Sequence, residues 1–140
     1  MDTTAPGLAA LTVFVEDLDA VAAFHRDVLQ LPQVFADEVS RVFDLGGTLL
    51  NVLAVGAAGE LVAPAAAAPA GGPAQVLLSL FVEDVDATCA QLRARGATLL
   101  NGPVDRPWGK RTAAFADPSG TVWEVAQDLA PRGGPTAGPG

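Results

Sequence analysis

The sequence predicts an α+β fold in which one βαβββ unit occurs twice. The first observation is an internal repeat, because LTVFVEDLDA at 11–20 returns as LSLFVEDVDA at 78–87. The second is a stretch at 55–74 that is rich in Ala, Pro and Gly and separates two segments of similar size. The third is a globular composition, with 50% hydrophobic and 17% charged residues. Similar segments on both sides of a linker indicate two modules of one topology.

Each module begins with a strand and a helix. The segments 11–15 and 78–82 are rich in β-branched and aromatic residues, which favours strands. An Asp follows each strand at a position that suits a helix N-cap, so we expect helices over roughly 17–29 and 84–95. Their apolar stripes are Leu18, Val21, Ala22, His25, Val28 and Leu29 in the first helix and Val85, Cys89 and Leu92 in the second. We expect His25 and Cys89, the only His and the only Cys, to pack against the sheets rather than to act chemically.

Three short strands complete each module. The turns DLGG (44–47) and DPSG (117–120) separate the last two strands of the two modules. Aligning these turns leaves six extra residues in the second module, which we place in a lengthened loop at 101–110. A loop that is longer in one copy of a repeat is a candidate for function, although Asp105 and Arg106 within it receive no role. The expected strands lie near 33–36, 39–44 and 48–54, and near 98–101, 110–116 and 121–127.

The expected organisation is a single domain that spans residues 1–140. The Pro- and Gly-rich end of the chain is typical of a flexible terminus. The parts are a first module at 9–54, a linker at 55–74, a second module at 75–128 and a flexible tail at 129–140.

Charge and composition exclude several classes of function. The net charge is −8, and the single Lys and seven Arg form no basic stripe, so we expect no nucleic-acid partner. The apolar stretch around 61–70 is Ala and Pro, which is unsuited to spanning a membrane. One Cys allows neither an intrachain disulfide nor a zinc knuckle. We therefore expect a cytoplasmic protein whose acidic character favours neutral or cationic ligands.

The two halves carry VEDLDAVAAFHRDVLQLP and PWGKRTAAFADPSGTVWEV, and over roughly residues 9–128 they resemble the vicinal oxygen chelate (VOC) superfamily. The DPSG turn followed four residues later by Glu124 is the most specific motif. The superfamily includes glyoxalase I, extradiol dioxygenases, fosfomycin-modifying enzymes and bleomycin-resistance proteins. The resemblance implies a curved, cup-shaped mixed sheet with helices on the outside. In bleomycin-resistance-like members a partner completes the cup, so we expect a homodimer.

The resemblance also assigns four metal-ligand positions. They fall on Ala10 and Leu77 in the first strands and on Asn51 and Glu124 in the last strands. A catalytic divalent metal usually needs about three protein ligands, and Ala10 and Leu77 have no donor atom. We therefore expect no metal cofactor. If a divalent metal is bound, Glu124 is the expected ligand.

Strand alternation predicts which side chains line the cup. If Ala116 pairs with Thr121 across the DPSG turn, Ala113 lies opposite Glu124 and Arg111 lies diagonal to it on the same face. A one-residue change in this register sends Arg111 to the opposite face. The expected ligand-binding residues are Phe14, Asn51, Ser79, Phe81, Trp108, Arg111, Phe115, Val122 and Glu124.

Three of these residues have more than one interpretation. Glu124 is a metal ligand, a general base or the ion-pair partner of Arg111, and the missing metal ligands favour the ion pair. Asn51 is a ligand-binding residue or a satisfied polar residue on a half-exposed strand. Trp108 forms part of the cup rim or anchors its own loop.

We expect a glyoxalase/bleomycin resistance-like protein that binds a small organic molecule in an apolar, acidic cup without a metal. Such a protein would sequester a toxic metabolite or drug. The alternative is a metal-dependent lyase, isomerase or dioxygenase that uses Glu124. A metal-free enzyme that uses Glu124 is the third possibility, and the sequence assigns no catalytic residue.

Overall fold

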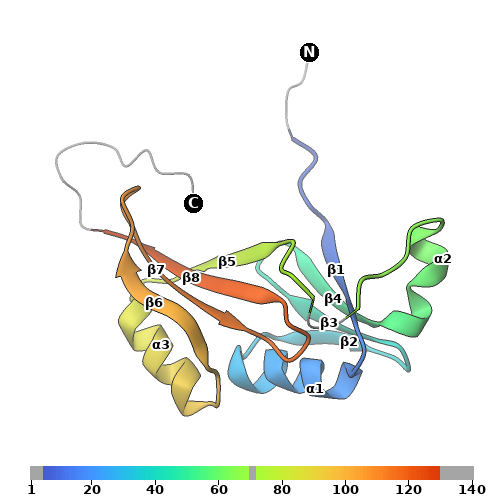
Figure 1. Cartoon of the computed structure of the whole chain (residues 1–140). Coiled ribbons are helices and arrows are strands. Elements are labelled where there is room, and N and C mark those ends of the chain that lie inside the picture. The colour runs from blue at the N-terminus through green and yellow to red at the C-terminus, as the bar shows by residue number, and fades with distance from the viewer. Residues whose placement is uncertain (1–4, 70–71, 130–140) are drawn as a thin grey trace. The chain divides into compact units, whose positions relative to one another are not determined.

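The computed structural model describes residues 5–69 and 72–129. The chain divides into two compact units, Met1–Ala70 and Gly71–Gly140. Residues 130–140 of the predicted tail lie outside the described residues. Figure 1 shows the elements of each unit along the chain. None of the described helices is long and apolar enough to cross a membrane.

The first unit is one mixed four-stranded sheet covered on one face by a helix. The strand order is β1-β4-β3-β2, with β1 parallel to β4 and the other neighbours antiparallel. Asp17 caps helix α1 by accepting a hydrogen bond from the Ala20 N–H at 3.0 Å, as the sequence predicts. The predicted βαβββ order is confirmed. The elements are β1 (Ala10–Val15), α1 (Leu18–Ala23), a π-helical turn (Phe24–Val28), β2 (Gln33–Ala36), β3 (Ser40–Asp44) and β4 (Leu49–Ala54).

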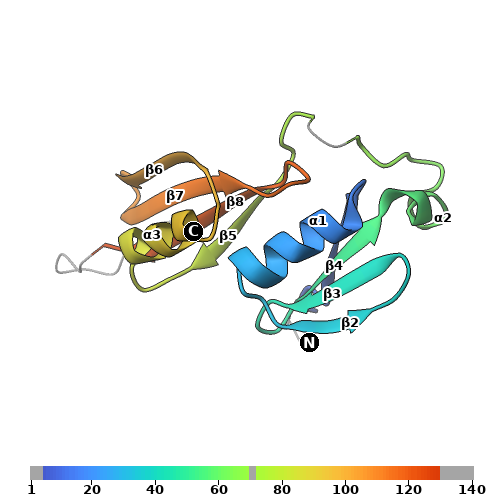
Figure 2. The ribbon, with the colours of Figure 1, turned by 90° about the horizontal axis from the view of Figure 1, so that it is seen from below.

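Helix α1 packs on one face of this sheet, as Figure 2 shows from below. Val21 and His25 are fully buried there, whereas Leu18 at the start of the helix is only half-buried. The His25 ring lies edge-on to Phe43 of β3, with 5.6 Å between ring centroids. The predicted packing role of His25 is therefore confirmed.

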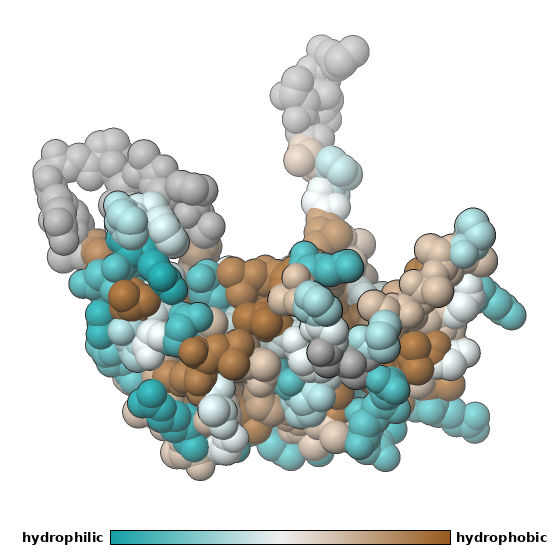
Figure 3. Space-filling view, in the orientation of Figure 1, coloured by the Kyte–Doolittle hydropathy of each residue, from teal (hydrophilic) through white to brown (hydrophobic). Residues whose placement is uncertain are grey.

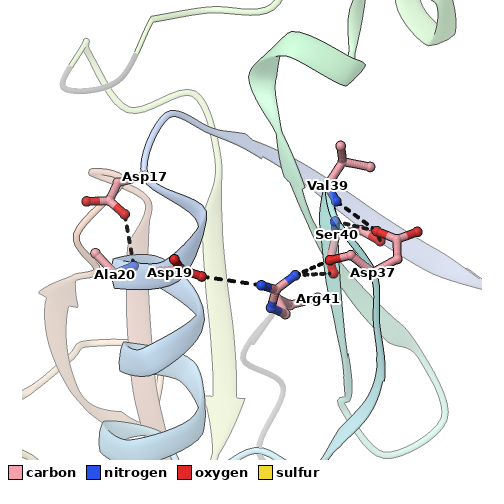
Figure 4. A network of polar contacts seen from close by, with 7 residues as sticks. All are labelled: Asp17, Asp19, Ala20, Asp37, Val39, Ser40 and Arg41. Atoms are coloured by element: carbon pink, nitrogen blue, oxygen red, sulfur yellow. Dashed lines mark hydrogen bonds and ion pairs between the residues drawn. The ribbon is translucent and has the colours of Figure 1, made fainter.

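The β2–β3 turn and the start of β3 connect the sheet to the helix (Figure 4). Asp37 Oδ1 accepts hydrogen bonds from the N–H groups of Val39 and Ser40, at 2.9 and 2.8 Å, and from the Ser40 hydroxyl at 2.9 Å. These bonds hold the pKa of the Asp37 carboxyl below its usual value. Arg41 donates to the Asp37 carbonyl and pairs with Asp19 of α1 at 3.3 Å.

The 55–74 segment contains more regular structure than a simple linker. A 3₁₀ turn at Val55–Ala57 is followed by the short helix α2 (Gly59–Val62), and Ala58 between them is fully buried. These turns lie at 55–62, before the Ala- and Pro-rich run at 63–69.

The second unit repeats the topology of the first. Its strand order is β5-β8-β7-β6, with β5 parallel to β8. Helix α3 packs on β6, β7 and β8 and buries Val85, Cys89 and Leu92, as the sequence predicts. Gln127 of β8 accepts a hydrogen bond from the Val85 N–H and so fixes the start of the helix. The elements are β5 (Leu77–Phe81), α3 (Val85–Ala94), β6 (Leu99–Asp105), β7 (Lys110–Ala116) and β8 (Val122–Asp128).

The six extra residues of the second module lengthen a strand rather than a loop. Strand β6 continues to Asp105, so only 106–109 connect it to β7. Its pairing with β7 is interrupted by bulges on both sides of Asn101. At Gly102 the strands approach closely: φ is +82°, and an added Cβ would lie 2.4 Å from the Thr112 carbonyl oxygen. The expectation of a long 101–110 loop is wrong because this bulged backbone stays paired.

Candidate functional site

The sheet of the second module has one face that α3 does not cover. Residues that pair across neighbouring strands point to the same face, so the register defines its members. Apolar side chains gather over β5 and β8 in Figure 3, and Phe81 and Leu77 are 70% and 52% exposed. We call this the open face. It carries Leu77, Ser79, Phe81, Asn101, Val104, Lys110, Thr112, Ala114, Ala116, Val122, Glu124, Ala126 and Asp128, of which Thr112, Ala114 and Ala126 are buried.

Glu124 lies near the middle of the open face. Ser79 is its register partner on β5, and the Ser79 hydroxyl donates to Glu124 Oε1 at 2.8 Å. Within the described part of the chain, no Lys or Arg lies at ion-pair distance from Glu124. The half-buried carboxylate is thus oriented by a neutral hydroxyl and keeps capacity to accept further hydrogen bonds.

The predicted register between β7 and β8 is wrong by one residue. Ala114, not Ala113, lies opposite Glu124, and Ala116 pairs with Val122 rather than with Thr121. The connection is a three-residue loop at 118–120, closed by a hydrogen bond of 3.0 Å from the Asp117 N–H to the Thr121 carbonyl. Gly120 has φ of +88°, which such a loop commonly requires at its last position.

This register moves Arg111 and Phe115 to the face covered by α3. Arg111 lies between Asp86 of α3, at 3.0 Å, and Asp105 of β6, at 2.9 Å. Hydrogen bonds to these two carboxylates raise the pKa of the Arg111 guanidinium. Phe115 is fully buried beside Trp123. The expected Arg111–Glu124 ion pair is therefore wrong, and Phe115 lies on the opposite face from Phe81 and Val122.

A different arginine reaches the open face. Arg106 in the β6–β7 turn donates from Nε to Thr112 Oγ1 at 3.0 Å and from Nη2 to Asn101 Oδ1 at 3.2 Å. Its guanidinium carbon lies 5.9 Å from the centroid of the Trp108 ring, and Trp108 is 43% exposed. Sequence reasoning missed Arg106. The available signal was the Pro107-Trp108-Gly109 triplet, which is typical of a three-residue hairpin loop.

A second cation on this side of the sheet is already neutralised. Lys110 pairs with Asp128, its register partner on β8. Its ammonium also lies 5.3 Å from the centroid of the Phe81 ring. The exposed Phe81 ring of the open face therefore already lies beside one cation, the Lys110 ammonium.

In the first module, alternation places Phe14 and Asn51 where the sequence predicts, on the face opposite α1. Thr12 pairs with Asn51, and Phe14 pairs with Leu53. Phe14 and Asn51 are both half-buried. In the part of the chain that the structure describes, the buried Asn51 Oδ1 has no hydrogen-bond partner. That oxygen can accept a hydrogen bond from a ligand or from water.

The four metal-ligand positions do not fit a divalent metal. Ala10 and Leu77 offer no donor atom, and Asn51 supplies only a neutral amide. Among residues 5–69 and 72–129, no cluster of three or more His, Cys, Asp and Glu could hold a metal ion. His25 and Cys89 are buried under the helices, and burial raises the pKa of the Cys89 thiol. The protein's own donors therefore provide one carboxylate, Glu124.

One protein family matches most of the chain. The family model of the Glyoxalase/Bleomycin resistance protein/Dioxygenase superfamily matches residues 7–125. A similar protein, the uncharacterized protein YraH of Bacillus subtilis (strain 168), is 30% identical over 126 residues, which are 87% of this chain and 98% of the relative.

Solved structures show the same fold. A glyoxalase/bleomycin resistance protein/dioxygenase from Nocardioides has a TM-score of 0.79 and 24% identity, and covers 99% of this chain and 93% of its own. A glyoxalase-related enzyme from Fulvimarina pelagi has a TM-score of 0.75 and 27% identity over 89% of each chain.

Proposed function

Because the chain belongs to the Glyoxalase/Bleomycin resistance protein/Dioxygenase superfamily, we propose that it binds a small organic molecule without a metal. The site is the open face of the second module, and the ligand is neutral or cationic. The biological role is sequestration or resistance. The observation that carries this proposal is the Glu124 carboxylate, oriented by Ser79 at 2.8 Å and neutralised by no cation of the described chain.

The surroundings of Glu124 suit an organic cation. Phe81 and Leu77 expose 70% and 52% of their surface on the same side of the sheet. An apolar surface with one oriented polar group is the usual composition of a small-molecule site. Aromatic rings attract cations, and the Lys110 contact with Phe81 is an example within this face. A ligand with an apolar body and an amine would satisfy both features.

The donor set argues against a metal-dependent reaction at the family's metal position. Within the second module these positions are Leu77 and Glu124, so a metal bound there would have one protein ligand. A divalent site of that composition falls short of the usual three protein ligands. A protein that only binds an organic molecule does not need the metal-ligand atoms that are missing here.

The test is the variant Glu124→Gln, with benzylamine and the uncharged benzyl alcohol as probes. We expect the substitution to weaken benzylamine binding by about 1–3 kcal/mol, since a charged hydrogen-bond partner is lost, and to leave benzyl alcohol binding nearly unchanged. Glu83→Gln is the matched control, because Glu83 is an exposed Glu of the same module. Isothermal titration calorimetry measures both affinities.

Metal content and melting temperature separate this proposal from the alternatives. If Glu124 is a metal ligand, protein purified without chelators contains a stoichiometric metal that Glu124→Gln abolishes. If Glu124 serves only the fold, the melting temperature falls while benzylamine affinity stays the same. Unchanged benzylamine affinity in Glu124→Gln contradicts the proposed site.

A further inference from the structure

We propose that Arg106 is the anion-binding end of this site, so that the ligand is an organic zwitterion that carries both a carboxylate and an amine. The inference rests on the proposed function, which assigns the amine to Glu124. It adds a second recognition group and a chemical class of ligand.

The first argument is that the Arg106 guanidinium is held in place. Nε donates to Thr112 Oγ1 at 3.0 Å and Nη2 donates to Asn101 Oδ1 at 3.2 Å. The Trp108 ring lies against the group, with 5.9 Å from the guanidinium carbon to the ring centroid. Two hydrogen bonds and a ring contact restrict a side chain that is otherwise rich in rotamers. Binding an anion there costs little further ordering of Arg106.

The second argument is charge. Both hydrogen-bond partners of Arg106 are neutral, and no Asp or Glu of residues 5–69 and 72–129 forms an ion pair with it. The neighbouring cations differ, because Arg111 lies between two carboxylates and Lys110 pairs with Asp128. A guanidinium has five N–H groups, and these bonds use two of them. The remaining N–H groups suit a carboxylate, which accepts from a planar fork.

The third argument is the position of Arg106 relative to Glu124. Asn101, Ala114, Glu124 and Ser79 lie in one row across β6, β7, β8 and β5. Asn101, which anchors the guanidinium, is two strands from Glu124, or about 10 Å at the usual strand spacing. The residue between them is Ala114, whose methyl group takes little space. Arg106, which donates to Asn101, and Glu124 are therefore a cation and an anion at two places along one face, with a small apolar residue between Asn101 and Glu124.

These two charges do not neutralise each other directly, since the structure records no ion pair between Arg106 and Glu124 in the described residues. A ligand with opposite charges at its two ends would complement both groups at once. An apolar body between these ends would span the row from Asn101 to Glu124.

The test compares two probes that differ by one charge. The zwitterion 4-(aminomethyl)benzoate carries both groups, and its methyl ester keeps the amine but lacks the anion. We expect the wild-type protein to bind the acid at least about tenfold more tightly than the ester, which is the usual effect of a charge-assisted hydrogen bond. In Arg106→Gln we expect this preference to disappear while the affinity for the ester stays the same.

Two further variants keep the test interpretable. Arg93→Gln removes the same charge from the exposed surface of α3 and should retain the full preference for the acid. Arg106→Lys keeps the charge without the planar fork, and we expect it to retain part of the preference for the acid. This variant tests the proposal if Arg106→Gln destabilises the turn. Melting temperatures of all variants report on folding.

The outcomes separate the two proposals. Equal binding of acid and ester by the wild-type protein, or a preference that survives in Arg106→Gln, overturns the role of Arg106. In that case Glu124-dependent binding of benzylamine still supports the proposed function. If instead the acid–ester preference depends on Arg106 while benzylamine affinity is unchanged in Glu124→Gln, the role of Glu124 is overturned and the anion site stands.

Discussion

Two arginines five residues apart have opposite surroundings in the second module. Arg111 lies on the helix-covered face between Asp86 and Asp105, where it joins α3 to the β6–β7 hairpin. Arg106 lies on the open face with neutral partners. The sequence alone does not distinguish these two arginines. The different faces give Arg111 two carboxylate partners, whereas both hydrogen-bond partners of Arg106 are neutral.

A pH-dependent contribution to stability is expected from Asp37. Because its pKa is lower in the folded protein than in the unfolded chain, the carboxylate stabilises the fold above the unfolded pKa of about 4. This contribution is lost as the pH falls through the folded pKa. We therefore expect Asp37→Asn to be less stable than wild type at pH 7, with the difference shrinking toward pH 3.

Chemical denaturation at the two pH values measures this difference. Glu38→Gln is the control, since Glu38 is an exposed carboxylate next to Asp37 in sequence. A constant difference between wild type and Asp37→Asn across this pH range would contradict the assignment.

The close approach at Gly102 gives a second prediction at the scale of one residue. An added Cβ would lie 2.4 Å from the Thr112 carbonyl oxygen and 2.7 Å from the Ala113 Cα, at a φ of +82°. Gly46 has a similar φ of +77° with no described atom within 4 Å of its added Cβ. We expect Gly46→Ala to cost about 1 kcal/mol through φ alone and Gly102→Ala to cost about 2 kcal/mol more.

Urea unfolding of the two variants isolates the steric contribution to the loss of stability, because the added side chains are held at nearly the same positive φ. Equal losses of stability would show that β6 moves away from β7 without penalty.

At the scale of elements, the length of each hairpin loop sets which side chains share a face. The β3–β4 turn has two central glycines with positive φ, Gly46 and Gly47, whereas the β7–β8 loop has three residues at 118–120. The second module therefore has one more loop residue than the first. That single residue changes which β7 side chains lie beside Glu124.

The β7–β8 loop is organised by one carboxylate. Asp117 Oδ1 accepts from the Ser119 N–H at 2.9 Å and from the Thr121 N–H at 3.1 Å. Asp117 Oδ2 accepts from the indole N–H of Trp123 at 3.0 Å, and Asp117 is only 5% exposed. We expect Asp117→Ala to lower the free energy of unfolding by about 2–4 kcal/mol, because buried donors lose a charged acceptor.

Asp44 provides the matched control from the other module. It occupies the equivalent turn, is exposed, and accepts a hydrogen bond from the Gly46 N–H at 2.7 Å. We expect Asp44→Ala to cost no more than about 1 kcal/mol in the same denaturation experiment. If both variants lose the same stability, the bond to Trp123 adds nothing.

At the scale of the whole molecule, two units of one topology leave sheet edges without partners. In the described residues, β2 and β6 are outer strands of their sheets, with Phe35 and Leu100 exposed by 52% and 56%. Exposed edges with apolar side chains are typical of surfaces that pair with another chain. A second copy related by a two-fold axis would cover the same surface on both chains.

We expect a homodimer with twice the monomer mass of 14.2 kDa. Sedimentation velocity at about tens of micromolar, within the usual affinity range of such contacts, measures this mass. Charged substitutions at Phe35 and Leu100 test which edge is involved. A monomer at that concentration contradicts the expectation.

The sequence by itself determined the order of the elements, the two modules and the faces of β1, β4, β5 and β8. The FVED repeat, helix caps and alternation predicted the topology, the helix packing of His25 and Cys89, and the shared face of Ser79 and Glu124. These features follow from local patterns, because helix and strand periods repeat within a few residues.

Only the tertiary structure decided the register of β7 against β8 and the extension of β6. It also decided that Arg106, rather than Arg111, lies on the open face. Register depends on where a loop closes, which here follows from the Asp117 hydrogen bonds, and a one-residue shift turns every side chain of a strand to the other face. The partners of Arg106 lie on two strands, at Asn101 and Thr112, and become neighbours only when those strands pair across a bulge. Strand pairing therefore determines which charged side chains lie at the candidate site. This pairing joins distant parts of the sequence, so no local sequence pattern predicts it.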